Sequence, residues 1–194
     1  MRFRFDEAVS PIIDLICDKQ DLGQLPIVLI DGRAGAGKSQ LAKGLSEAYF
    51  KLDKQAARVV AMDDLYPGWE GLSSGSVYLY EKILRPLSQG ETASWQVWDW
   101  LENKRGVNDE MAGNREFSGG TALIVEGCGS ISRLTSEIAD LTIWIEADSA
   151  IRKARFSARD AGKFDEYFGV WSAQEDEFYE RENSQQLAQI TIEN

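Results

Sequence analysis

The sequence contains no histidine among its 194 residues. This absence excludes Ser-His-Asp and Cys-His catalysis, zinc sites built on imidazole, and proton transfer by imidazole near neutral pH. Carboxylates, lysines and arginines must therefore carry any chemistry. The only two cysteines, Cys17 and Cys128, are far apart in the chain. They predict no disulfide framework, and they favour a reducing compartment, the cytoplasm.

Basic residues are also scarce, because 21 Lys and Arg stand against 32 Asp and Glu, for a formal charge of -11. A surface of this sign repels polyanions, so we expect no nucleic-acid partner. Apolar runs are short of the roughly 18 residues that a membrane helix needs, and residues 1–6 lack a signal-peptide core, so no membrane partner is expected. The length and a hydrophobic fraction of 43% predict one globular domain over residues 1–194.

Short β-branched runs bounded by turn residues predict buried parallel strands at 27–30, 59–62, 123–125, 141–145 and 190–192. Helical patterns lie between them at 39–50, roughly 76–87 and 149–160. A further helix is predicted over 5–20, with Ser10 as its N-cap and Pro11 in its first position. The alternation predicts an α/β fold with a doubly wound parallel sheet flanked by helices. Residues 106–120 are polar and glycine-bearing, which predicts a loop.

The strongest motif in the sequence is a complete GxxxxGK[ST] pattern between a predicted strand and a predicted helix. Its eight residues are Gly32, Arg33, Ala34, Gly35, Ala36, Gly37, Lys38 and Ser39. Glycines let backbone N–H groups converge on phosphate oxygens, and the helix N-terminus adds its positive dipole end. Lys38 is expected to reach the β and γ phosphates, and the Ser39 hydroxyl to bind magnesium. The motif predicts a P-loop that binds ATP with Mg²⁺.

Acidic residues follow two other predicted strands. Glu126 ends the strand at 123–125, where a second magnesium ligand belongs in such sites. Asp63 and Asp64 follow the strand at 59–62, and alternation along an extended chain would place them on opposite faces. One of them could then accept a proton from an alcohol near the γ phosphate. A pair of turn-forming aspartates is the alternative.

Aromatic residues gather at 95–100, where three of the six tryptophans fall. In an extended segment, Trp98 and Trp100 share one face and could stack on a flat ring, although core packing is an equal alternative. A reversal of charge follows at 152–163, which carries five basic residues and one acid. Helical spacing there predicts a common face for Arg152, Arg155 and Arg159, able to clamp phosphates; a solvated basic face is the alternative.

Five segments, taken in order, resemble the uridine kinase and phosphoribulokinase-like group of P-loop kinases: residues 31–39, 62–66, 97–100, 125–127 and 155–160. The resemblance spans roughly residues 26–183. It is strongest toward a bacterial uridine-kinase-like branch of ATP-binding proteins with a DDLYPGW stretch, here residues 63–69.

The resemblance implies a kinase that transfers the γ-phosphoryl group of ATP, with Mg²⁺, to a hydroxyl of a small molecule, a nucleoside above others. It implies that Asp63 is the catalytic base and that Lys38, Arg155 and Arg159 act on the phosphates, the arginines from a lid at about 152–165.

The same resemblance implies that Tyr66, Trp98 and Trp100 contact the nucleoside. Asn103 stands where the family has a histidine that contacts the pyrimidine. Kinases for pantothenate, sugar or nicotinamide-riboside-like acceptors, and a regulatory ATPase, remain open alternatives. Also open are ATP against GTP, roles for Asp64 and Asp99, and a homo-oligomeric state.

Overall fold

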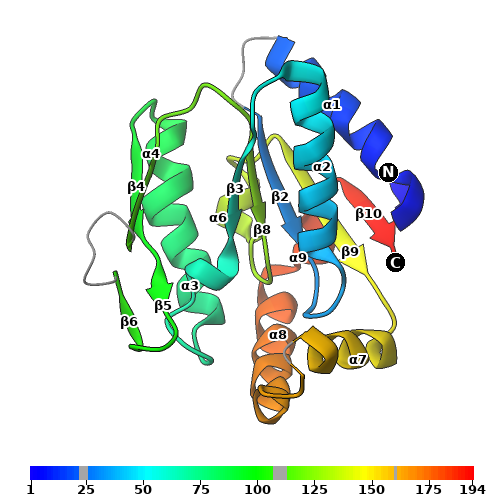
Figure 1. The fold of residues 1–194 in the computed structure, drawn as a ribbon, viewed down its shortest axis with the longest axis vertical. Coiled ribbons are helices and arrows are strands. Elements are labelled where there is room, and N and C mark those ends of the chain that lie inside the picture. The colour runs from blue at the N-terminus through cyan, green and yellow to red at the C-terminus, as the bar shows by residue number, and fades with distance from the viewer. Residues whose placement is uncertain (22–25, 107–112, 160) are drawn as a thin grey trace.

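A six-stranded parallel sheet forms the centre of the computed structural model, which describes residues 1–21, 26–106, 113–159 and 161–194 (Figure 1). The strand order is β1-β10-β9-β2-β8-β3, and each neighbouring pair is parallel. The strands are β1 (Arg2–Arg4), β2 (Ile27–Asp31), β3 (Arg58–Ala61), β8 (Leu123–Glu126), β9 (Leu141–Glu146) and β10 (Ile190–Glu193). The predicted doubly wound α/β fold is confirmed.

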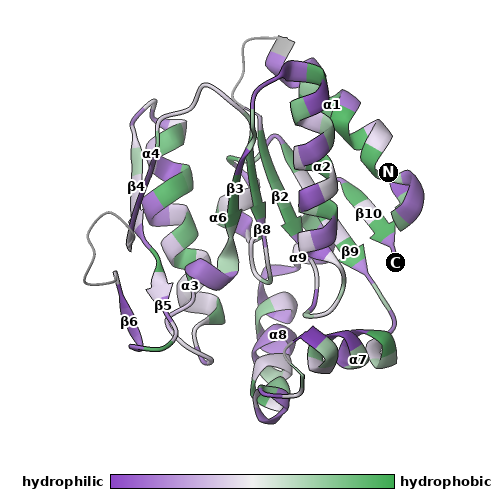
Figure 2. Ribbon diagram, viewed as in Figure 1, coloured by the Kyte–Doolittle hydropathy of each residue, from purple (hydrophilic) through white to green (hydrophobic). Residues whose placement is uncertain are grey.

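The central strands β2, β8 and β9 are buried on both faces and have nearly continuous hydrophobic sequences (Figure 2). Successive side chains of a strand point to opposite faces. In β2, Val28 and Ile30 pack with residues of α1 and α2, whereas Ile27 and Leu29 pack with residues of α3 and α8. The helices therefore cover the sheet in two layers, with a hydrophobic core on each side.

The helices follow the predicted alternation with different ends. They are α1 (Val9–Asp21), α2 (Lys38–Asp53), α3 (Leu72–Leu79), α4 (Arg85–Ser88), α6 (Arg133–Ser136), α7 (Ser149–Arg159), α8 (Phe168–Glu182) and α9 (Ser184–Leu187). The helix predicted over 5–20 begins later, at Val9, because Phe5–Glu7 forms a separate 3-10 turn; Ser10 therefore lies inside the first turn and is not the N-cap. The helix predicted near 76–87 starts at Leu72 and reaches α4 through a π-helical turn at Tyr80–Leu84.

Two short antiparallel pairs lie beside the main sheet. β4 (Ala93–Gln96) pairs with β7 (Asn114–Phe117), and β5 (Trp98–Asp99) pairs with β6 (Lys104–Arg105). The loop predicted at 106–120 is therefore wrong at β7, where Phe117 packs into the core while its neighbours stay polar; residues 107–112 of that loop lie outside the described residues. In the described ranges, every helix is too short or too polar to span a bilayer.

Candidate active site

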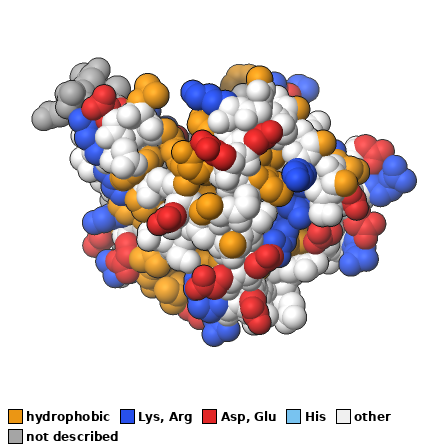
Figure 3. All heavy atoms as spheres, turned by 90° about the horizontal axis from the view of Figure 1, so that it is seen from below, with side chains coloured by type: hydrophobic (Ala, Val, Ile, Leu, Met, Phe, Trp, Pro, Cys, Tyr) orange, Lys and Arg blue, Asp and Glu red, His pale blue; other side chains and the backbone are white. Residues whose placement is uncertain are grey.

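A cavity of about 720 Å³ opens at the carboxyl ends of β2, β3 and β8. It is lined by the P-loop, the 3-10 turn Met62–Asp64, the turn after β5, the loop after β8, α7 and its following segment, and α8. α7 and α8 lie beyond the strand ends in Figure 1. The face viewed in Figure 3 carries hydrophobic side chains interspersed with carboxylates and basic groups. Ligands of doubly wound folds bind at this end of the sheet.

The P-loop joins β2 to α2, and its backbone leaves little space for side chains. Gly35 has a φ of 80°, and a Cβ on it would overlap the carbonyl group of Arg152. Lys38 begins α2 and is buried, and its Nζ donates to the carbonyl oxygens of Gly32 at 2.8 Å and Arg33 at 3.0 Å. Burial would lower the pKa of Lys38, but acidic groups around it outweigh burial and raise that pKa. Lys38 therefore stays charged in the cavity wall, as phosphate binding requires.

Ser39 and Glu126 meet across the gap between α2 and β8. The Ser39 hydroxyl lies near the Glu126 carboxylate. Burial raises the pKa of Glu126, while the Lys38 charge and the Ser39 hydroxyl lower it. These adjacent oxygen donors fit the partial shell that Mg²⁺ accepts when phosphates supply further ligands. Among the described residues, no group of three or more acidic or cysteine side chains could hold a metal ion by itself.

Both aspartates of the Met62–Asp64 turn line the cavity. The prediction that they point to opposite faces is wrong, because the chain leaves β3 at Ala61 and enters a 3-10 turn instead of staying extended. Asp63 Oδ2 lies 3.4 Å from Arg159 Nη1. Burial and the neighbouring Asp63 charge raise the pKa of Asp64, and Arg115 partly opposes them.

The predicted common face of the three arginines in α7 points toward the P-loop and the aspartates. Arg152 Nη1 donates to the carbonyl of Ala34 at 3.3 Å, and Arg155 Nη1 donates to that of Gly35 at 3.4 Å. Arg159 reaches Asp63. Arg155 and Arg159 line the cavity. Two guanidinium groups thus stand beside the site where phosphates would lie, a placement suited to stabilising transferring negative charge.

Aromatic rings form one wall of the cavity, the aromatic wall, and Trp69 lies at the centre of their contacts. The Trp69 ring stacks on Tyr167, with ring centroids 4.6 Å apart, and lies 5.2 Å from both Trp100 and Phe164. Trp171 packs edge-on against Trp69 at 6.2 Å. Apart from Tyr167, these rings line the cavity. Flat apolar surfaces of this kind favour a ligand with an aromatic ring.

Tyr66 and Trp100 of the predicted acceptor contacts reach the cavity. Tyr66 is buried and its hydroxyl donates to the carbonyl of Cys128 at 2.7 Å, so only its ring is available to a ligand. Trp100 Nε1 donates to the carbonyl of Asp63 at 3.0 Å. Trp98 and Asn103 are not among the lining residues; Trp98 packs instead against the guanidinium of Arg105.

Three residues of the P-loop motif also lie outside the cavity lining: Gly32, Arg33 and Ala36. Ala36 is buried in the core on the α1 and α2 side of the sheet. The Arg33 side chain turns toward α8, where Nη1 lies 2.6 Å from Asp176 Oδ1.

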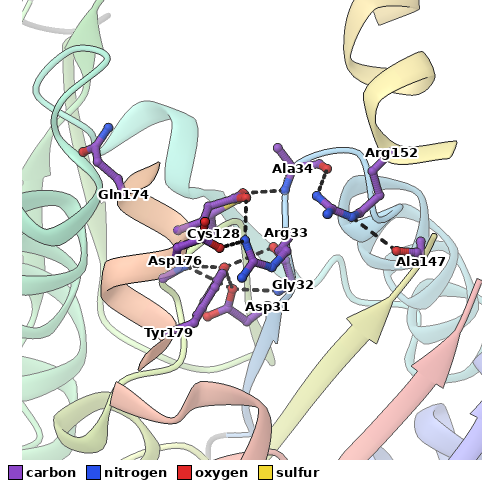
Figure 4. Close-up of polar contacts among 12 residues, drawn as sticks. Asp31, Gly32, Arg33, Ala34, Cys128, Ala147, Arg152, Gln174, Asp176 and Tyr179 are labelled. Carbon is purple, nitrogen blue, oxygen red and sulfur yellow. Dashed lines mark hydrogen bonds and ion pairs between the residues drawn. The ribbon is translucent and has the colours of Figure 1, made fainter. Parts of the chain in front are cut away.

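Asp31 supports the P-loop from below and was not among the predicted site residues (Figure 4). It is fully buried at the end of β2, and its carboxylate accepts from the N–H groups of Gly32, Gly129 and Ile131 and from the Tyr179 hydroxyl. Burial raises the pKa of Asp31 to about 6, against these hydrogen bonds. The only feature of the sequence that pointed to a role for Asp31 was its position immediately before the P-loop motif. No sequence feature pointed to Tyr179.

Solved structures provide a comparison for this arrangement. A structure described as a possible uridine kinase from Bacillus stearothermophilus is similar over 93% of this chain and 96% of that one, with a TM-score of 0.59 and 18% identity. The chain has the fold of the P-loop kinases. A protein from Silicibacter sp. TM1040 assigned as a fructose transport system kinase matches 95% of this chain and 98% of its own, with a TM-score of 0.58 and 19% identity.

A third similar structure, D-glycerate 3-kinase from Cryptococcus neoformans var. grubii, covers 85% of this chain and 84% of its own, with a TM-score of 0.55 and 13% identity. No protein-family model and no curated protein sequence matches the chain. The resemblance in fold to the uridine-kinase-like P-loop kinases is thus confirmed. The three neighbours differ in the acceptor that their names give, so their fold does not select one.

Proposed function

We propose that the protein transfers the γ-phosphoryl group of ATP to a hydroxyl group of a small, ring-bearing molecule such as a nucleoside. The observation that carries this proposal is the composition of one cavity. It is lined by P-loop groups, by the aromatic wall, and by carboxylates and guanidinium groups. Phosphoryl transfer needs these groups around one cavity, because the acceptor hydroxyl must lie in line with the γ phosphate.

Each side chain has a role in this proposal. Lys38 and the P-loop N–H groups bind the phosphates, and Ser39 and Glu126 would hold Mg²⁺, whose charge offsets that of the phosphate oxygens. Asp63 orients the acceptor hydroxyl and takes its proton. Arg155 and Arg159 stabilise the charge that spreads over the transferring group.

The aromatic wall favours a nucleoside over the acceptors named for two of the structural neighbours. A sugar or glycerate presents mainly hydroxyl and carboxylate groups, which gain less from contact with aromatic rings than a flat base does. A base presents a flat π surface that stacks on tryptophan. The proposed enzyme needs ATP and its acceptor, and we place it in the cytoplasm from its cysteine usage. A homo-oligomeric state remains a prediction.

A coupled assay of ADP release tests this proposal. Purified protein is incubated with Mg²⁺-ATP and each of a panel of nucleosides, vitamins and sugars, and any product is identified by mass spectrometry. We expect acceptor-dependent ADP release with a nucleoside, and its loss in Lys38→Ala. Release that is independent of every acceptor would instead favour the regulatory ATPase.

A further inference from the structure

Glu175 is a fully buried carboxylate on α8 whose partners come from the P-loop region. Its Oε1 accepts from the Ala34 N–H at 2.6 Å and from the Cys128 thiol at 3.3 Å. Its Oε2 lies 3.6 Å from Arg33 Nη1 and has no hydrogen bond among the described residues. Glu175 of α8 therefore contacts Arg33 and Ala34, the second and third residues of the P-loop motif, although it lies 141 positions after Ala34 in the chain.

A carboxylate in this position is costly. Taking a charge out of water costs several kcal/mol, which an ion pair recovers only with good geometry and full hydrogen bonding. Here one oxygen has no hydrogen bond, and the Arg33 guanidinium lies closer to the exposed Asp176. An apolar side chain of the same volume would serve packing better. The contact with Ala34 is what an apolar side chain could not provide.

The same helix contacts both the aromatic wall and the P-loop region. Gln174 Nε2 donates to the carbonyl of Trp69 at 2.7 Å, and Trp171 lines the aromatic wall. One turn later, the Tyr179 hydroxyl donates to Asp31 at 2.7 Å, beneath the P-loop (Figure 4). Glu175 lies between these contacts, so α8 joins the aromatic wall to the phosphate-binding loop. Three residues of α8 contact that loop directly: Glu175 at the Ala34 N–H, Asp176 at the Arg33 guanidinium and Tyr179 at the Gly32 carbonyl.

We propose that Glu175 is a positioning residue for nucleotide binding, which acts by fixing the Ala34 N–H and with it the backbone of the P-loop. It touches neither the phosphates nor the acceptor. The proposal rests on nucleotide binding by the proposed kinase, but it does not depend on which acceptor is used.

Two variants separate the hydrogen bond from the charge. Glu175→Met keeps the unbranched shape but offers Ala34 no oxygen, whereas Glu175→Gln keeps an acceptor oxygen; both remove the negative charge. Electrostatics alone predicts that both bind the ATP polyanion more tightly, since a buried negative charge near Lys38 is gone. Positioning predicts that they differ, because only Glu175→Gln keeps an oxygen that can accept from the Ala34 N–H.

The measurement is calorimetric titration of the intact protein with Mg²⁺-ATP, alongside urea unfolding. We expect Glu175→Met to bind ATP about 10-fold or more weakly and to be less stable, because the Ala34 N–H loses its acceptor. We expect Glu175→Gln, which keeps an acceptor oxygen, to stay within about threefold of the wild type in ATP affinity. Asp176→Asn is the matched control, because it removes the other carboxylate facing Arg33 at the surface; its ATP affinity should change less than about threefold.

Two results would overturn the proposal: ATP affinity of Glu175→Met within threefold of the wild type, or Glu175→Gln no better than Glu175→Met. If Glu175→Met does not fold, hydrogen exchange of the Ala34 amide, measured by NMR in the wild type and in Glu175→Gln, tests the proposal instead. Loss of protection of this amide in Glu175→Gln would refute the proposal that the retained oxygen accepts from Ala34. ATP binding needs no acceptor. Failure of the acceptor screen would therefore count against the proposed kinase activity, whereas the role of Glu175 is decided by the ATP titrations alone.

Discussion

Replacement of Asp31 by asparagine tests how the P-loop is anchored. Asp31 Oδ1 accepts from Gly32 N–H at 2.7 Å, Gly129 N–H at 3.0 Å and the Tyr179 hydroxyl at 2.7 Å, and Oδ2 accepts from Ile131 N–H at 2.8 Å. An asparagine can keep the first set, but its NH₂ group then faces the Ile131 donor. Leaving a buried donor unsatisfied costs about 1–3 kcal/mol, so Asp31→Asn should lower the free energy of unfolding by that amount at pH 7.

The pH dependence of this difference is a sharper test. Because the pKa of Asp31 is raised from 3.8 to about 6 in the folded protein, the folded state holds the proton more tightly than the unfolded chain. The resulting stability is fully present below pH 3.8 and is lost as the pH rises through about 6. Between pH 5 and pH 7, linkage gives a loss of roughly 1 kcal/mol. Asparagine does not titrate, so the advantage of the wild type over Asp31→Asn should be larger at pH 5.

Urea unfolding of both proteins at pH 5 and pH 7 gives the four free energies needed. Other carboxylates titrate alike in the two proteins and cancel in the difference. Equal differences at the two pH values would mean that Asp31 is already ionised at pH 5. A larger difference at pH 7 would reverse the sign and refute the account of a buried carboxylate with a raised pKa.

Three kinetic and spectroscopic predictions concern the cavity. Asp63→Asn should lower kcat by roughly 10² to 10⁴, the range for losing a general base, with little effect on ATP affinity. Asp64→Asn should lower kcat much less. If steady-state rates with the identified acceptor fall more in Asp64→Asn than in Asp63→Asn, Asp64 is the base. Arg159→Ala should lower kcat more than it raises the acceptor KM, because the guanidinium acts on developing charge; a change in KM alone would contradict this. Trp100→Phe should reduce the fluorescence change on acceptor binding, and Trp98→Phe should leave it intact, since only the first ring lines the cavity.

The P-loop and the strands could be predicted from sequence because each depends on neighbours in the chain. Gly32 to Ser39 are contiguous, and the apolar runs of the sheet need only alternate with helices. β7 could not be predicted in the same way, because its pairing partner β4 lies some 20 residues earlier and its outer face is polar. Local composition there is typical of a loop, and the strand depends on pairing with β4 and on the packing of Phe117 into the core.

The tryptophan segment shows a different limit. Placing Trp98 and Trp100 on one face assumed an extended backbone through both residues, but β5 ends at Asp99. The chain then turns, which carries the Trp100 ring to the Asp63 carbonyl and leaves Trp98 with Arg105. The contact of Glu175 with the P-loop is still harder to predict, because no sequence pattern near Glu175 indicates it. Its role depends on how α8 packs.

The order of the strands explains why separate acidic residues reach one site. In the sheet, β2, β8 and β3 are neighbours, so the P-loop, Glu126 and Asp63 emerge side by side. With strands about 4.8 Å apart, Glu126 is one strand spacing from the P-loop and Asp63 is two. This places the proposed metal ligand nearer the P-loop and the proposed base farther out, where an acceptor would enter. Glu146, which ends β9 on the other side of β2, instead accepts from Trp144 Nε1 outside the cavity. An acid at a strand end is thus a site residue only if the sheet places its strand on the correct side of the P-loop.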